Sequence, residues 1–162
     1  NLILAFVLVK FVIYPAIGLI LSTQFPIVAV VSGSMEHNGL DFDSWWNQNK
    51  DWYEERDISK EEFLEFRYMN GFNKGDIMFL KGVKPKDIKV GDVLVYETPF
   101  HSNPIIHRIV GIGDKEFITK GDNNHREDPS VVAEQFERTG KAVLRLPLLG
   151  WVKIWFVDMF VR

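Results

Sequence analysis

The stretch from Val93 to Lys120 reads VLVYETPFHSNPIIHRIVGIGDKEFITK and decides the fold class. It holds three short runs rich in β-branched and aromatic residues, Val93–Tyr96, Ile105–Val110 and Phe117–Lys120. The Asn-Pro and Gly-Asp-Lys sequences between these runs favour turns. Short runs separated by turn residues are typical of antiparallel strands. Similar runs lie at Ile27–Val31, Ile77–Leu80 and Val143–Leu146, so we expect a mainly β fold built on an antiparallel β-sheet.

The composition excludes several classes of function. The net charge is −3, and the lysines and arginines are scattered, so the chain has no basic surface of the kind that binds nucleic acid. It contains no cysteine, which excludes disulfides, a thiol nucleophile and thiolate metal ligands. The 162 residues suffice for one domain with a sizeable core.

The N-terminal segment has the length and composition of a membrane span. From Asn1 to Leu21 the polar side chains are those of Asn1, Lys10 and Tyr14. As a helix this segment would be about 30 Å long, enough to cross a bilayer core. We therefore expect a transmembrane anchor over residues 1–22 and a β-rich domain over residues 23–150. A cleaved signal peptide fits less well because the apolar part is too long, and a buried core helix is the other alternative.

Residues 41–70 differ in character from the predicted strands. Nine acidic and four basic side chains lie in this segment. Its aromatic residues fall at helical spacing, and Ser59-Lys60-Glu61-Glu62 is a capping box. We expect a small α-helical insert of two short helices. Its aromatic side chains either cap the β core or contact a membrane interface or a partner; they are Trp45, Trp46, Trp52 and Tyr53.

A serine and a histidine are candidates for nucleophilic catalysis. A serine hydroxyl is a weak nucleophile until a base accepts its proton, and histidine titrates in the range that this role needs. Ser34 follows a predicted strand, next to a glycine that lets the backbone approach a substrate. His107 lies within another predicted strand. Each signal is ambiguous alone, because Ser-Gly-Ser commonly forms a simple turn and three other histidines compete for the role: His37, His101 and His125.

Two aspartates, Asp122 and Asp128, lie in a turn-rich loop that is by default simply solvated. Either carboxylate could orient a histidine base and fix its tautomer. Both aspartates and His107, with or without His125, could instead ligate zinc or manganese. A further alternative is a membrane-tethered β-rich binding or assembly module in which Ser34 and His107 are structural.

Taken together, these motifs resemble the type I signal peptidases, particularly their archaeal and endoplasmic-reticulum branch. In that family a membrane anchor leads into a Ser-x-Ser-Met box, followed by Gly-Asp-Ile/Val boxes and a histidine box. A Gly-Asp-Asn-Asn box with a second aspartate six positions on comes last. The matching segments here are Ser32-Gly33-Ser34-Met35, Gly75-Asp76-Ile77, Gly91-Asp92-Val93, Ile106-His107-Arg108-Ile109-Val110, Gly121-Asp122-Asn123-Asn124 with Asp128, and the closing Leu149-Gly150-Trp151-Val152-Lys153.

The chain departs from the family pattern in two places. The family often has proline after the Ser-Met-x triplet, where this chain has His37, so the turn beyond the nucleophile is expected to differ. The acidic, tryptophan-rich insert resembles an expansion found in some archaeal members, and its role stays open.

The resemblance implies a membrane-bound serine endopeptidase that removes signal peptides from secretory preproteins, after small residues, without a metal or cofactor. Ser34 would be the nucleophile and His107 the general base. Asp128 would orient His107 while Asp122 supports the loop, although the reverse assignment is open. The Ser34 N–H and the Ser32 hydroxyl would hold the oxyanion. The catalytic domain would lie on the extracytoplasmic or lumenal side of the bilayer.

Two further expectations concern single segments. Residues 151–162 are apolar but too short to span a membrane alone, so they either begin a second membrane helix or lie in the interface. If His107 were not the base, Lys120 or Lys81 would be the most plausible replacement.

Overall fold

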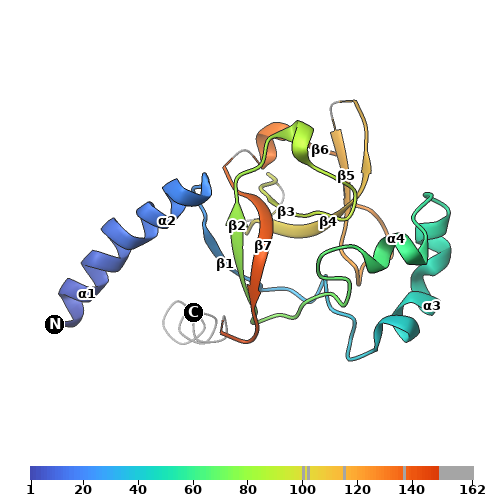
Figure 1. Ribbon diagram of the computed structural model, residues 1–162, viewed down its shortest axis with the longest axis horizontal. Helices are drawn as coiled ribbons and strands as arrows, with labels where there is room; N and C mark the ends of the chain where they lie inside the picture. Colours follow the sequence, from blue (N-terminus) through green and yellow to red (C-terminus); the bar gives the residue numbers. More distant parts are fainter. Residues whose placement is uncertain (100, 102, 115, 137, 150–162) are drawn as a thin grey trace.

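A seven-stranded antiparallel sheet forms the body of the molecule, with helices at two opposite ends (Figure 1). The computed structural model describes residues 1–99, 101, 103–114, 116–136 and 138–149. The strand order is β1-β2-β7-β3-β4-β5-β6. The strands are β1 (Ile27–Ala29), β2 (Ile77–Lys81), β3 (Val93–Tyr96), β4 (Ile105–Ile112), β5 (Glu116–Lys120), β6 (Val131–Val132) and β7 (Gly140–Leu146). The expectation of a mainly β, antiparallel fold is confirmed.

The strand boundaries differ from most of the predicted ones: β2 and β5 are each one residue longer, and β4 extends two residues further, to Ile112. β1 ends at Ala29, two residues early, while β6 was not predicted and β7 begins three residues before the predicted run. β6 has two residues, too few for a sequence pattern. β7 begins at Gly140, whose φ is +118°, and a Cβ there would lie 2.2 Å from the Lys81 carbonyl oxygen. The strand can therefore begin this close to β2 only because the residue is glycine.

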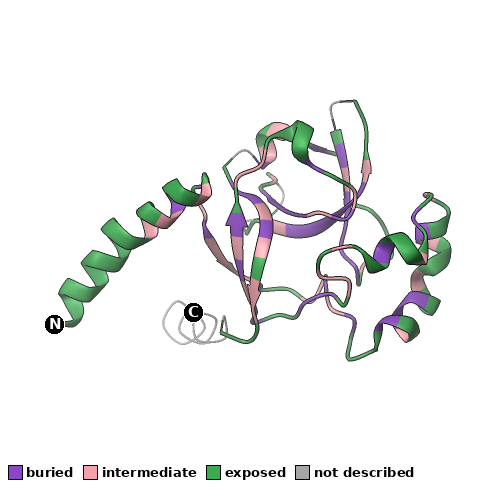
Figure 2. Cartoon of the chain, in the orientation of Figure 1, coloured by how far each residue is buried: buried purple, intermediate pink, exposed green. Residues whose placement is uncertain are grey.

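The N-terminal helix extends away from the sheet (Figure 1). It consists of α1 (Leu2–Leu8), a π-helical segment η1 (Val9–Ile13) and α2 (Tyr14–Leu21). Pro15 has no N–H to continue the α-helical ladder, and the turn before it widens into the π form. The apolar side chains of this helix are exposed, which rules out a buried core helix (Figure 2). Among the described residues, this is the one helix long and apolar enough to cross a membrane.

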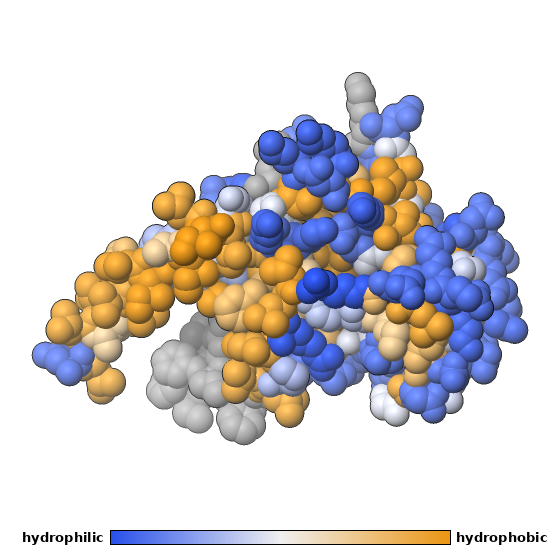
Figure 3. All heavy atoms as spheres, in the orientation of Figure 1, coloured by the Kyte–Doolittle hydropathy of each residue, from blue (hydrophilic) through white to orange (hydrophobic). Residues whose placement is uncertain are grey.

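The insert forms α3 (Phe42–Glu54) and α4 (Lys60–Leu64), as predicted. Side-chain oxygens cap both helices: Asp41 accepts the Ser44 N–H, and Ser59 accepts the Glu62 N–H. The insert lies at the end of the sheet opposite the N-terminal helix, and its outer surface is hydrophilic (Figures 1 and 3).

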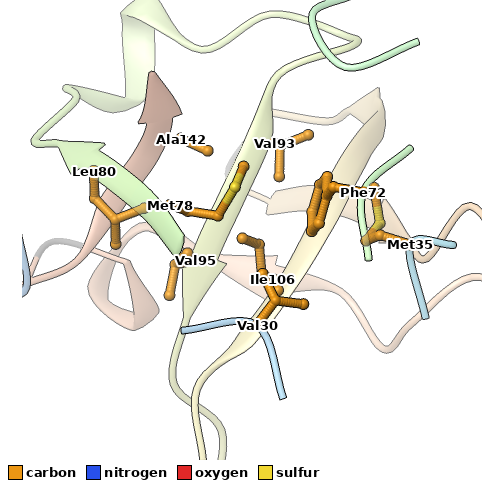
Figure 4. Close-up of a cluster of buried hydrophobic side chains, with 9 residues drawn as sticks. All are labelled: Val30, Met35, Phe72, Met78, Leu80, Val93, Val95, Ile106 and Ala142. Carbon is orange, nitrogen blue, oxygen red and sulfur yellow. The ribbon is translucent and has the colours of Figure 1, made fainter. Parts of the chain in front are cut away.

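Buried side chains form three apolar clusters. The first lies beside β1 and includes Met35 and Ile106 (Figure 4). The second joins the insert to the sheet, because Trp45, Trp46, Tyr53 and Phe63 pack with Val110 of β4. The aromatic residues therefore cap the β core, one of the two roles considered for them. The third cluster covers the far strands, with Leu94, Tyr96, Ile109 and Phe117 among its members.

The predicted C-terminal apolar segment, residues 151–162, lies outside the described residues. The same holds for all but Leu149 of the predicted closing segment Leu149–Lys153.

Phe63 links the insert to the sheet, and its removal tests how far the insert is part of the folded core. Its side chain is fully buried against the rings of Trp45, Trp46 and Tyr53. We expect Phe63→Ala to lower the free energy of unfolding by about 3–5 kcal/mol through the cavity that it leaves. Leu64→Ala is the matched control, because Leu64 is 41% exposed in the same helix. Urea denaturation of the detergent-solubilised protein measures both, and equal shifts would contradict this packing.

Candidate active site

Ser34 lies in a loop that follows β1 and is fixed by its neighbours. The Glu36 N–H donates to the Gly33 carbonyl oxygen at 3.1 Å and closes a turn around Ser34. Met35 is buried in the first apolar cluster, and its carbonyl oxygen accepts the Phe72 N–H at 3.0 Å. Burial of Met35 therefore fixes the neighbouring Ser34 at the edge of the apolar core.

The loop of residues 121–128 packs directly on this nucleophile loop. The Asn123 N–H donates to the Ser34 carbonyl oxygen at 2.8 Å, and the Asn123 side-chain amide donates to the Gly33 carbonyl oxygen at 3.1 Å. A Cβ on Gly121 would lie 2.6 Å from the Ser34 carbonyl oxygen. Glycine at position 121 thus allows the two backbones to approach closely enough for these hydrogen bonds.

Ser34, His107 and Asp128 form a continuous chain of polar contacts. The His107 Nε2 atom lies 2.9 Å from the Ser34 Oγ atom, and the His107 Nδ1 atom lies 2.5 Å from Asp128 Oδ2. His107 is buried on β4, opposite Leu94 of β3. Ser32 Oγ lies 3.2 Å from Ser34 Oγ, on the exposed side of the loop. This is the arrangement of a nucleophile, a base and a group that orients the base.

Two side chains that the sequence analysis did not single out hold the Asp128 carboxylate. The Thr119 hydroxyl and the Tyr96 hydroxyl both donate to Oδ2, at 2.8 and 3.0 Å. Burial acts to raise the pKa of Asp128, but the hydrogen bonds from His107, Thr119 and Tyr96 outweigh it, and the pKa is lowered. Asp128 is therefore held in its ionised form against His107.

Asp122 does not contact His107; it forms a fully buried ion pair with Arg108. The guanidinium Nε and Nη2 atoms donate to the two carboxylate oxygens at 2.9 and 2.7 Å. The remaining Arg108 donors reach the backbone carbonyls of Arg67, Tyr68 and Gly91. Burial acts to raise the pKa of Asp122, yet the Arg108 charge and hydrogen bonds lower it to about 2.

The insert surrounds this ion pair with aromatic rings. The Arg108 guanidinium lies 4.9 Å from the centre of the Phe63 ring. His37 stacks on Trp45 with ring centres 3.9 Å apart, and its Nε2 atom lies 3.5 Å from Asp122 Oδ2. His37, which stands where the family often has proline, thus packs on the insert. The two departures of this chain from the family pattern are therefore in contact.

A second cationic side chain, Lys120, lies in the same region. Its Nζ atom donates to the Gly121 carbonyl oxygen at 3.0 Å and lies 4.9 Å from the ring centres of both Trp52 and Tyr53. Burial lowers the pKa of Lys120 to about 8. Its ammonium group faces the insert, so the geometry does not favour Lys120 as the base for Ser34.

A cleft of about 600 Å³ opens beside Ser34 and His107. Its walls come from α2, β1, β3, β4, the nucleophile loop, the loop between β3 and β4, and the loop of residues 121–128. The lining side chains include Tyr14, Val28, Val31, His101, Ile106 and Asn124. The lining combines apolar side chains beside β1 with polar side chains around Ser34, which suits a peptide chain.

The candidate site residues from the sequence thus fall into two groups. The structure brings Ser34, His107, Asp128 and Ser32 together, and it places Asp122 on the insert side with Arg108. Of the competing histidines, His101 lines the cleft, His37 stacks on Trp45 and His125 is exposed in the loop. Among the described residues, no three histidine, aspartate or glutamate side chains converge as metal ligands, so the alternative metal site is not supported.

Sequence comparison places this geometry among known proteins. The signal peptidase complex catalytic subunit SEC11 of Scheffersomyces stipitis is 32% identical over 155 residues, which cover 89% of this chain and 73% of that protein. The SEC11 of Clavispora lusitaniae is 32% identical over 164 residues, covering 94% of the chain and 78% of that protein. Human SEC11C is 29% identical over 150 residues, which cover 85% of this chain and 61% of that protein. The chain belongs to the signal peptidase family. No protein-family model matches it.

Membership of the signal peptidase family agrees with the branch predicted from the Ser-Gly-Ser-Met and His-Arg boxes. The residues of those boxes have two different uses in the structure. Ser34 and His107 face the cleft, whereas Met35 and Arg108 are buried and hold the surrounding loops.

The buried ion pair makes a prediction about stability. Asp122→Asn should lower the free energy of unfolding by about 3–5 kcal/mol, because it leaves Arg108 buried without a counter-charge. The double variant Arg108→Met/Asp122→Asn is the matched control and should be more stable than the single variant. Urea denaturation at pH 7 measures both, and a single variant as stable as the wild type would contradict the pair.

The same pair predicts a dependence on acid pH. The folded pKa of Asp122, about 2, lies below the unfolded value of 3.8, so its stabilisation is complete above pH 4. It should be lost as the pH falls from about 4 to 2. The wild type should therefore lose stability more steeply over this interval than Asp122→Asn. Parallel curves for the two proteins would contradict the lowered pKa.

Proposed function

We propose that the chain is a membrane-bound serine endopeptidase that cleaves signal peptides from secretory preproteins. Membership of the signal peptidase family supports this activity, because the relatives are catalytic subunits of signal peptidase complexes. The catalytic roles are assigned from the hydrogen bonds that link Ser34 to His107 and His107 to Asp128. A purely structural role for these residues would not explain why a serine hydroxyl at the mouth of a cleft bonds to a buried histidine.

The roles of the three residues follow from their contacts. With its proton on Nδ1, His107 donates to Asp128 and can accept the Ser34 proton at Nε2. Ser34 Oγ then attacks the scissile carbonyl carbon, and His107 returns the proton to the amine as the C–N bond breaks. Water hydrolyses the resulting ester of Ser34 by the same route in reverse. The Ser34 N–H and the Ser32 hydroxyl stabilise the oxyanion, and one such donor contributes about 3 kcal/mol.

Asp122 has a supporting role in this proposal. It holds the loop of residues 121–128 through Arg108, so that Asn123 can bond to the nucleophile loop and Asp128 can reach His107. Because Asp122 is buried and paired with a guanidinium, water cannot replace its carboxylate.

The substrate would bind as an extended strand along β1. This strand is at one edge of the sheet, pairs with β2 on one side and leads directly to Ser34. A peptide at a free edge gains main-chain hydrogen bonds, while side-chain pockets supply specificity. Apolar side chains line the cleft beside β1, and we expect the residues before the cut to be small.

We further propose that residues 1–22 anchor the protein in a bilayer and that residues 23–150 form the peptidase domain. The exposed apolar surface of the N-terminal helix supports this division (Figure 3). Signal peptides are cut after they leave the cytoplasm, so the domain would lie on the extracytoplasmic or lumenal side. Names of the relatives refer to a complex, and partner subunits of this chain would contact it in or near the membrane.

The catalytic assignment is tested by cleavage of a model preprotein in detergent. Ser34→Ala and His107→Ala should each abolish processing, since members of a catalytic unit do not substitute for one another. Ser130→Ala and His125→Ala are matched controls on the exposed loop and should retain activity. Cleavage by folded Ser34→Ala would contradict the assigned triad, and absence of cleavage by the folded wild type would favour a non-catalytic binding module. Inhibition of the wild type by a chelator would favour metal chemistry instead.

The two aspartates should respond differently to substitution. Asp128→Asn keeps the shape of the side chain but cannot stabilise a protonated His107, so kcat should fall on the order of 10⁴-fold with the fold intact. Asp122→Asn should act mainly through stability, and the fraction that is folded should retain more activity. Circular dichroism gives the folded fraction of each variant, and the cleavage rates are divided by that fraction before they are compared. A larger loss of activity for Asp122→Asn would mean that the roles of the two aspartates are exchanged.

A further inference from the structure

One side chain of the membrane helix reaches the cleft. Tyr14 begins α2, and it lines the same cleft as Ser34 and His107. Its phenol oxygen is placed to accept the backbone N–H of Ile27, the first residue of β1. Tyr14 and Lys10 are the two polar side chains between Leu2 and Leu21. A polar group in a membrane helix needs a partner, and Tyr14 finds its partner on the strand proposed to bind substrate.

The end of the helix is attached to the domain, so the position of Tyr14 is set by the fold. The Gly82 N–H donates to the Leu21 carbonyl oxygen at 2.8 Å, and the Gln24 N–H donates to the Arg138 carbonyl oxygen at 3.0 Å. Gly18 is buried one turn after Tyr14, where a Cβ would lie 2.8 Å from the Thr23 carbonyl oxygen. These contacts hold α2 next to β1 (Figure 1).

The hydrogen bonds of β1 show which of its backbone groups are directed away from β2. Val30 donates to the Asp76 carbonyl and accepts the Gly75 N–H, and the Pro26 carbonyl accepts the Leu80 N–H. Because successive residues of a strand alternate, the backbone groups of Ile27, Ala29 and Val31 face the outer edge. Tyr14 bonds to the first of these three, which leaves Ala29 and Val31 for an added strand.

The direction of the substrate follows from the two fixed ends of the cleft. The apolar part of a signal peptide must lie with the membrane helix, and its cleavage site must lie at Ser34. The substrate therefore runs parallel to β1, from Tyr14 toward Ser34. The strand rise places Ile27 roughly 13 Å from Val31, which is the length of about four extended residues.

We propose that Tyr14 is a positioning residue that ends the substrate-binding edge of β1 at the membrane side. This inference rests on the proposed function. The phenol ring lines the cleft on the membrane side, and its bond to Ile27 occupies an outward-facing N–H that a longer substrate strand would otherwise use. A signal peptide can thus be extended only between Tyr14 and Ser34, and the chain before that point must be in its membrane helix. Tyr14 sets the spacing between that helix and the bond that is cut.

The test is a series of model preproteins in lipid vesicles, in which the spacer between the apolar helix and the cleavage motif is lengthened by two or four residues. Steps of two residues preserve strand alternation. Initial rates are measured together with the mass of the mature product. For the wild type, the rate should fall as the spacer lengthens. For Tyr14→Ala, the ratio of the rates on the longer and original substrates should rise roughly three- to tenfold, the range expected for one additional hydrogen bond.

Phe11→Ala is the matched control, because Phe11 is an aromatic residue of the same helix that is 63% exposed and outside the cleft. Its rate ratio should equal that of the wild type. Tyr14→Phe keeps the ring but removes the hydrogen bond to Ile27, so it should shift the rate ratio in the same direction as Tyr14→Ala. It replaces the alanine variant in the test if that variant does not fold. Unchanged ratios for the folded Tyr14 variants would overturn the inference. Failure of the wild type to cleave any substrate would instead overturn the proposed function.

Discussion

The buried ion pair between Arg108 and Asp122 joins segments that are far apart in the sequence. Arg108 lies on β4 and Asp122 in the loop after β5, and the other guanidinium donors bond to the carbonyls of Arg67, Tyr68 and Gly91. A buried charge is tolerated only when its hydrogen bonds are satisfied, so each of these segments has to occupy its observed place. The position of Asp122 then brings Gly121 and Asn123 onto the nucleophile loop. The site is therefore assembled around a charge pair that takes no part in the proposed chemistry.

Alternation along β4 separates this structural pair from the cleft. His107 and Arg108 are adjacent, and neighbouring strand residues face opposite sides of the sheet. His107 contacts Ser34 and Asp128, while Arg108 faces Phe63 and Phe66 of the insert. One strand thus supplies a proposed base on one face and the anchor of the supporting loop on the other.

The insert gains a physical role from this arrangement. It lies far from the N-terminal helix, its outer face is hydrophilic, and its aromatic rings cover Arg108 and Lys120 (Figure 3). Arg56 of the insert, stacked on Trp52, donates to Glu127, the residue before Asp128. His37 packs on Trp45, so the change from the family proline and the presence of the insert belong to one contact region. Chains without the insert would need another cover for this ion pair.

The sequence by itself determined the features that depend on neighbouring residues. The strands other than β6, the cap at Ser59, the membrane-length helix and the family boxes all follow from local pattern, and the fold class follows from their order. The tertiary structure alone decided which aspartate reaches His107, since Asp122 and Asp128 lie in one polar loop and share the same local signal. It also decided the contacts of Tyr96 and Thr119 with Asp128, and of Tyr14 with β1. These contacts join residues that are not neighbours in the sequence, and their geometry depends on how the strands pair and how buried charges are satisfied, which no local pattern records.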